Sequence, residues 1–236
     1  MINIAVLVSG HGRGSNLQAI IDACKDGRID GRVAIVIGTK DDAPAIARAR
    51  SEGIATVAIS PKACGSDEVY AQGVLQILNE HQADLICLAG YMRVLPTQIV
   101  SAYRWRIMNI HPALIPLFCG KGMYGEHVHQ AVLEYGMKVA GCTVHFVDEE
   151  YDTGPIIVQK AINVRENDTP ETLAARVLVQ EHKAYPKAIQ LFAKGQIKVN
   201  GGAIDPHDFA EQLTLFAERR AKVVIRRVLK KSGVHS

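Results

Sequence analysis

Regular alternation of apolar strand-like segments with helical segments over the first 110 residues most strongly constrains the fold. Residues 2–8 predict a buried strand, and the segment after them has the apolar spacing of an amphipathic helix. Further strands are predicted at 33–37, 55–59, 85–88 and 107–110, and further helices at 43–52 and 70–78. This order predicts a Rossmann-like α/β fold, a mainly parallel twisted sheet with helices on both faces.

The second half of the chain departs from this pattern. Two predicted strands, 143–147 and 155–164, flank an acidic turn. Thr169 and Pro170 predict the start of a long helix, in which we expect Pro186 to cause a kink or an interruption. We therefore expect one domain over residues 1–204 and a basic C-terminal helical extension over 205–236.

Charge and composition exclude several classes of protein. Hydrophobic residues make up 48% of the 236 residues, which is ordinary for a soluble globular protein. Residues 205–236 hold seven Lys and Arg against four Asp and Glu, or 7 − 4 = +3, so the rest of the +3 chain is neutral. A neutral body gives no support to a nucleic-acid partner. Without a signal peptide or a membrane-length apolar run, we expect a cytoplasmic protein with no membrane partner.

Metal and disulfide chemistry also find little support. The cysteine count of five is odd, and no C-x-x-C pair occurs, so we expect reduced thiols. His127 and His129 have the spacing of a metal pair, but the sequence near them offers no third ligand. We therefore expect no bound metal.

The loop after the first predicted strand is rich in glycine. Gly10, Gly12 and Gly14 precede Ser15, which occupies the position of the last glycine in a dinucleotide fingerprint. The loop also lacks the Lys-Ser/Thr of a P-loop, so one phosphate group at a helix N-terminus is the ligand that fits. The alternative is a capping box formed by Ser15 and Gln18, which needs no ligand.

Two polar residues end the fifth predicted strand. Asn109 and His111 are two positions apart, so they share one face of an extended strand. An amide and an imidazole that point together can stabilise an oxyanion and donate a proton, although a polar strand end has the same pattern. An aspartate beside His111 would orient its ring and raise its pKa. Asp152, in the acidic turn, is the candidate, or else an ordinary turn residue.

Glu181 falls on the apolar face of the long predicted helix. It lies four residues after Val177 and three after Leu178. A carboxylate there is costly unless it is paired or binds a ligand. Sugar hydroxyls and a buried ion pair both remain open as its partner.

Together these motifs resemble those of the folate-dependent formyltransferases, and among them the phosphoribosylglycinamide formyltransferase family of purine synthesis. The resemblance extends from residue 2 to about residue 200. The matching motifs are Gly14-Ser15-Asn16-Leu17-Gln18, residues 88–95, Asn109-Ile110-His111-Pro112, residues 143–147, Asp152-Thr153-Gly154-Pro155 and Gln180-Glu181-His182.

The resemblance implies a formyltransferase fold and an enzyme that moves a formyl group from the co-substrate 10-formyltetrahydrofolate to the amine of phosphoribosylglycinamide. It implies Asn109, His111 and Asp152 as catalytic residues. It further implies Gly14, Ser15 and Asn16 at the phosphate, Glu181 at the ribose hydroxyls, and Met92, Arg93, Val94, Leu95, Asn109 and Asp148 at the folate.

The chain departs from the family pattern in places. The glycine loop is lengthened by residues 11–13, and Asp67 stands where some relatives carry an arginine that contacts the folate tail. Lys121 lies in a long loop from which it can reach the phosphate.

Rival readings are a formyltetrahydrofolate hydrolase, a methionyl-tRNA formyltransferase and a non-catalytic nucleotide-binding module. The first two would be expected to carry a further domain. A homodimer is also left open.

Overall fold

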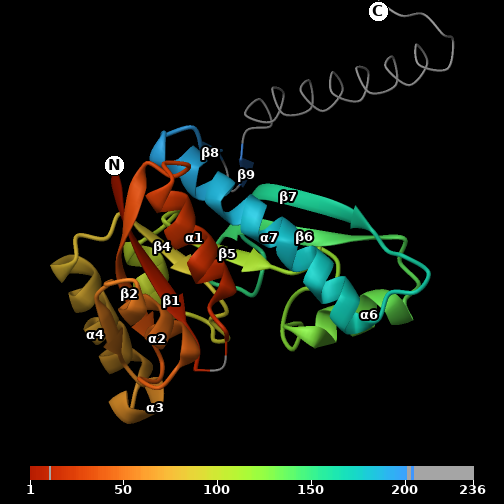
Figure 1. Ribbon diagram of the computed structural model, residues 1–236. Helices are drawn as coiled ribbons and strands as arrows, with labels where there is room; N and C mark the ends of the chain where they lie inside the picture. The colour runs from red at the N-terminus through yellow and green to blue at the C-terminus, as the bar shows by residue number, and fades with distance from the viewer. Residues whose placement is uncertain (11, 201–202, 205–236) are drawn as a thin grey trace, which may run out of the picture.

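A seven-stranded sheet forms the centre of the fold (Figure 1). The computed structural model describes residues 1–10, 12–200 and 203–204, so the predicted extension over 205–236 lies outside the described residues. In spatial order the strands are β3 (Thr56–Ala58), β2 (Gly31–Gly38), β1 (Ile2–Val8), β4 (Leu85–Leu88), β5 (Ile107–His111), β6 (Val139–Phe146) and β7 (Ile156–Asn163). A separate two-stranded sheet pairs β8 (Val199–Asn200) with β9 (Ala203–Ile204).

The first five strands of this order run parallel, and the last two add antiparallel pairs. The central parallel strands β1 and β4 are almost continuous runs of buried apolar residues, because helices cover both faces. The predicted Rossmann-like, mainly parallel sheet is therefore confirmed, as is the hairpin β6–β7 around the acidic turn.

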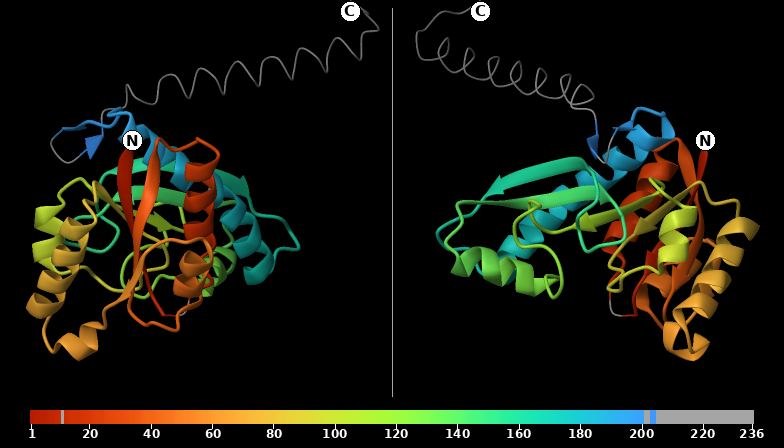
Figure 2. Two further views of the ribbon diagram at one scale, coloured as in Figure 1. Left: turned by 60° about the vertical axis from the view of Figure 1, so that its left-hand side comes forward. Right: turned by 180° about the vertical axis from the view of Figure 1, so that it is seen from behind.

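Helices form a layer on each side of the sheet (Figures 1 and 2). One apolar core lies under α1 (Ser15–Lys25), α2 (Pro44–Ser51) and α7 (Pro170–Ala193). The other lies under α4 (Asp67–Glu80) and α5 (Thr97–Ala102). The remaining helices are α3 (Pro61–Cys64), which contacts α4, and α6 (Glu126–Glu134), which contacts α7. Among the described residues, no helix has both the length and the apolar character to cross a membrane.

Helix α7, with 24 residues, is the longest element in the described part of the chain. It begins as predicted, because the Thr169 side chain accepts a hydrogen bond from the backbone of Thr172 and Pro170 follows as the first helical residue. The helix continues through Pro186, so the predicted interruption is wrong. Proline removes one backbone hydrogen bond, at a cost of about 3 kcal/mol. Buried residues of α7 on both sides of Pro186, among them Val177 and Ile189, pack in the core and offset that loss.

From β1 the chain adds β2 and β3 on one side of the sheet, and β4 and β5 follow on the other side, so the order of strands reverses between β1 and β4. The loops after these two strands are joined by hydrogen bonds. The backbone N–H of Ser9 donates to the carbonyl of Gly90 at 3.3 Å. The hydroxyl of Ser9 accepts from the backbone N–H of Met92 at 2.8 Å. Ligands of open α/β sheets bind beyond the strand ends at such a reversal, so this edge holds the candidate site.

Candidate active site

The glycine loop leaves the start of α1 without a side-chain cap. Gly14 is the N-cap residue, with a left-handed φ of 71°, and Ser15 is already the first helical residue. The alternative of a capping box formed by Ser15 and Gln18 is therefore excluded. Gln18 instead bonds the side chains of Asp22 and Glu52. Among the described residues, the first amides of α1 have no acceptor, so they can bind an anion.

Glu181 lies beside this loop and is only 8% exposed. The side-chain amide of Asn16 donates to its Oε2 at 2.7 Å. Burial raises the pKa of Glu181, and the hydrogen bond from Asn16 only partly opposes that rise. No ion pair to Glu181 exists among the described residues. Of the two explanations left open by the sequence, a ligand for Glu181 fits this geometry better than a buried ion pair.

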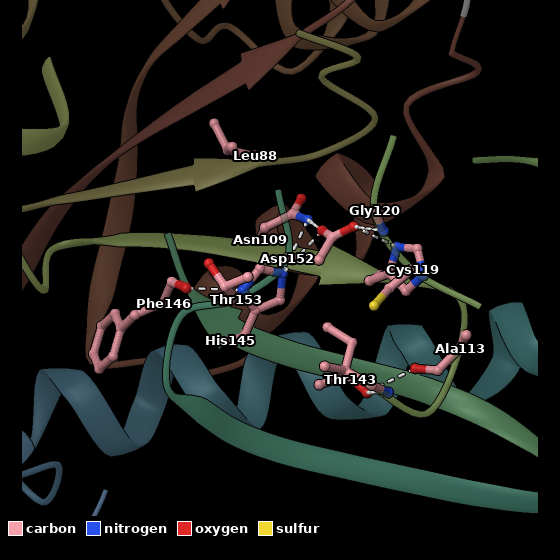
Figure 3. A network of polar contacts seen from close by, with 12 residues as sticks. Leu88, Asn109, Ala113, Cys119, Gly120, Thr143, His145, Phe146, Asp152 and Thr153 are labelled. Carbon is pink, nitrogen blue, oxygen red and sulfur yellow. Dashed lines mark hydrogen bonds and ion pairs between the residues drawn. The ribbon is translucent and has the colours of Figure 1, made fainter. Parts of the chain in front are cut away.

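Asn109, His111 and Asp152 converge at the end of β5, and Figure 3 shows Asn109 and Asp152 turned toward each other. The amide nitrogen of Asn109 lies 3.5 Å from Oδ1 of Asp152. Nδ1 of His111 lies 3.8 Å from the other oxygen, Oδ2. The sequence could not show that the acidic turn reaches the strand end, and the structure brings the three side chains together.

The tautomer of His111 follows from its contact with Phe118. Nε2 lies 2.8 Å from the Phe118 carbonyl, which can only accept, so Nε2 carries a hydrogen. The nitrogen that gains and loses a proton is therefore Nδ1, which faces Asp152. Burial lowers the pKa of His111 and outweighs the Phe118 carbonyl and the Asp152 charge, which both raise it. The charge of Asp152 thus raises the pKa of His111 as expected, but burial makes the net shift downward.

Asp152 is fixed by its backbone as well as by its neighbours. Its φ is 56°, in the left-handed region that few non-glycine residues adopt. The N–H of Gly120 donates to Oδ2 at 2.9 Å. Burial raises the pKa of Asp152, but its interactions with the nearby His145 ring, the N–H of Gly120 and the charge of His111 together bring it below its usual value. Asp152 therefore remains a carboxylate near neutral pH.

The sequence analysis did not identify His145 as a site residue. It lies opposite Asn109 in the antiparallel pairing of β5 with β6. Nδ1 lies 2.8 Å from the Phe146 carbonyl, so it carries the hydrogen, and Nε2 accepts from the Asn109 amide at 3.2 Å. Thr143 and His145 alternate on one face of the predicted strand, and this pattern is visible in the sequence. The sequence does not show that His145 lies opposite Asn109 on the neighbouring strand.

The predicted folate residues follow β4. Met92 and Val94 are 51% and 41% exposed, so their side chains are open to a ligand. The side chain of Leu95 is buried in the core under α4 and α5, so Leu95 can contribute to a folate site only through its backbone. Arg93 pairs with Asp67 at 3.7 Å.

Asp148 begins the acidic turn. Its carboxylate accepts from the hydroxyl of Thr153 at 2.7 Å and from the backbone of Glu150 at 3.3 Å. The side chain therefore holds the turn that carries Asp152, and this is the role the contacts support.

The two histidines of the H-x-H pair do not face a common ligand. The His127 ring packs edge-on against Tyr124, while His129 is buried. In the part of the chain that the structure describes, no group of three His, Cys, Asp or Glu side chains is placed to hold a metal.

Comparison with known proteins decides the family. The model of the formyl transferase family matches residues 2–189. The chain belongs to this family. Phosphoribosylglycinamide formyltransferase of Escherichia coli is 43% identical over 202 residues, which cover 86% of this chain and 92% of that protein. The resemblance drawn from the motifs is thus confirmed, and this relative is a transferase.

Two further relatives extend the comparison. The chloroplastic phosphoribosylglycinamide formyltransferase of Arabidopsis thaliana is 45% identical, over 83% of this chain and 66% of that protein, just under two thirds of its length. The crystal structure of glycinamide ribonucleotide transformylase 1 from Symbiobacterium toebii superposes with a TM-score of 0.81 at 46% identity. That match covers 86% of this chain and 93% of the other.

Proposed function

We propose that this chain transfers the formyl group of 10-formyltetrahydrofolate to the amine of phosphoribosylglycinamide, a step of purine biosynthesis. The observation that carries the proposal is the convergence of Asn109, His111 and Asp152 on the sheet edge that also holds an uncapped helix start. The names of its relatives support this choice of substrates.

The ribonucleotide fits the groups around α1. We propose that the free amides at Gly14, Ser15 and Asn16 bind its phosphate. Glu181 then accepts hydrogen bonds from the ribose hydroxyls through the carboxylate oxygen that Asn16 does not use. A diol that donates two hydrogens offsets the cost of burying an ionised carboxylate.

The formyl folate fits the loop after β4. Its ring system would lie along residues 92–95, beside the exposed side chains of Met92 and Val94. The turn of Asp148 and Asp152 would close over it. In this arrangement the formyl carbon comes to the end of β5, beside Asn109 and His111.

The chemistry then follows from the cluster. The neutral amine attacks the formyl carbon, and the carbonyl oxygen becomes an oxyanion. The Asn109 amide, which contacts His145 and Asp152, donates a hydrogen bond to this oxyanion. Nδ1 of His111 donates a second one when the ring is protonated, a form that the charge of Asp152 favours and burial disfavours. Asp152 stabilises the charged ring and accepts the amine proton through a water. The same proton reaches the folate nitrogen as its bond to carbon breaks, so the protons balance.

A formyltetrahydrofolate hydrolase remains the nearest alternative, because it would use the same three catalytic residues. Its acceptor is water, which needs neither an anion site nor a carboxylate for a diol. The uncapped start of α1 and the buried Glu181 therefore favour transfer to a ribonucleotide.

A mass-spectrometric assay tests the proposal. Purified protein with 10-formyltetrahydrofolate and phosphoribosylglycinamide should produce the N-formyl ribonucleotide. A folded protein that forms none of it would refute the assignment.

Residues 1–204 are proposed to be the whole catalytic domain, and 205–236 an extension outside the chemistry. A protein that ends at residue 204 should keep the turnover of the full chain. Loss of turnover with an unchanged melting temperature would place the extension in the site. The small-molecule partners follow from the proposed reaction, while a homodimer and the absence of a nucleic-acid partner stay predictions.

A further inference from the structure

Helix α2 packs directly against the glycine loop. A Cβ atom on Gly14 would lie 3.0 Å from both Cα and Cβ of Ala45, so the loop backbone is in close contact with the helix. Only glycine fits this contact and the left-handed φ of 71° together. The first turn of α2 thus fixes where the loop can lie.

Arg48, one turn further along α2, binds the loop directly. Its Nε donates to the carbonyl of Arg13 at 3.3 Å, and its Nη1 donates to Oε1 of Gln18 at 2.8 Å. Carbonyl and N–H point in opposite directions across a trans peptide. Because Arg48 draws the Arg13 carbonyl toward α2, the N–H of Gly14 points to the other side, where the free amides of α1 begin.

The charge of Arg48 is not neutralised by an ion pair within the described part of the chain. Both of its acceptors are uncharged groups. The nearest acidic side chain in the network, Glu52, forms an ion pair with Lys25 and a hydrogen bond with Gln18. A cation that is held beside empty amides raises their affinity for an anion.

We propose that Arg48 is a positioning residue that sets the specificity for a phosphorylated substrate. It orients the peptide between Arg13 and Gly14 and supplies the positive charge of the site. This inference rests on the proposed function, because it assumes that the ribonucleotide phosphate binds at the start of α1.

Phosphate dependence separates this role from a purely structural one. Glycinamide ribonucleotide and glycinamide ribonucleoside, which lacks the phosphate, are compared as acceptors or as competitive inhibitors. Arg48→Met removes the charge and both hydrogen bonds. It should raise the KM of the ribonucleotide about tenfold, equivalent to about 1.4 kcal/mol. The kcat, the KM of the formyl folate and the KM or Ki of the ribonucleoside should change less than about twofold.

Two further variants control the experiment. Arg48→Lys keeps the charge and loses the planar pair of donors, so its KM should lie between those of wild type and Arg48→Met. Arg50→Met is the matched control on the same helix, because Arg50 binds Asp41 and Thr56 instead of the loop. It should leave every constant near the wild-type value.

If Arg48→Met weakened binding of the ribonucleotide and of the ribonucleoside equally, as measured by KM or Ki, the inference would be overturned. An unchanged KM of the ribonucleotide in Arg48→Met would also overturn it. If Arg48→Met does not fold, Arg48→Lys takes its place in the same comparison. The affinity of wild type and of Arg48→Lys for ribose 5-phosphate is then measured by calorimetry, and an unchanged affinity would overturn the inference. A wild-type protein with no formyl transfer would instead refute the proposed function.

Discussion

Nδ1 of His111 and Oδ2 of Asp152 lie 3.8 Å apart, and one short loop fixes both side chains. The carbonyl of Phe118 holds Nε2 of His111, and the N–H of Gly120 holds Asp152. The separation is too long for a direct hydrogen bond. Asp152 therefore favours the charged form of His111 through its charge and not through a direct hydrogen bond.

Substitution of His111 tests its role as the proton donor. His111→Ala should lower kcat by about 100-fold or more, as expected for a lost general acid. The KM of either substrate should change little. His81→Ala is a suitable control, because His81 ends α4 and bonds the carbonyl of Ile77. Near-normal turnover of His111→Ala in steady-state assays would exclude the role.

Substitution of Glu181 tests the ribose contact. Glu181→Gln should raise the KM of the ribonucleotide about tenfold or more, because a hydrogen bond to a charged group contributes about 1.5–3 kcal/mol. Glu134→Gln, at an exposed position of α6, is the matched control. An unchanged KM would leave Glu181 without a substrate role.

The same variant has a stability signature. Because burial raises the pKa of Glu181, the folded protein disfavours the ionised form. The cost is absent below the unfolded pKa of about 4.3 and grows as the pH rises through the folded pKa. Glu181→Gln should therefore melt at a higher temperature than wild type at pH 8, with the difference vanishing near pH 4. A lower melting temperature at pH 8 would contradict this account.

His129 should control part of the acid sensitivity. Burial, and then the charge of His111, lowers its pKa to about 4. The folded state therefore requires a neutral ring, and stability present above pH 6.5 is lost as the pH falls toward 4. Between pH 7.5 and pH 4.5, the unfolding free energy of wild type should fall more steeply than that of His129→Gln, by up to about 3 kcal/mol. Parallel pH profiles in urea titrations would show that His129 is not responsible.

Gly154 allows the acidic turn to approach β6. A Cβ atom there would lie 2.0 Å from the carbonyl oxygen of Phe146. Gly154→Ala should therefore displace the turn, lower stability by about 1–3 kcal/mol and reduce kcat by moving Asp152. Thermal melts and steady-state kinetics would measure both effects. Wild-type values for both would mean that the turn position does not matter.

The sequence predicted the parts of the fold that follow from local patterns. The buried runs of β1 and β4 have the predicted bounds, and the helical spacing around Glu181 correctly placed that residue on an apolar face. Helices α3 and α5, with four and six residues, are too short to show a helical period and were missed.

The candidate site was only partly predictable, for physical reasons. The contact of Asn109 with His145 depends on the register of two antiparallel strands, which no local pattern specifies. The direction of the His111 pKa depends on how deeply packing buries the ring. Ser15 and Gln18 had the spacing of a capping box, but Gln18 bonds Asp22 and Glu52 instead.

The partition of the formyl group between two acceptors tests the central claim most directly. Release of tetrahydrofolate from 10-formyltetrahydrofolate is measured with purified protein, with and without phosphoribosylglycinamide. Release should depend on the ribonucleotide, with one N-formyl product for each folate released. Rapid release of formate that is unaffected by the ribonucleotide would contradict the account and identify a hydrolase.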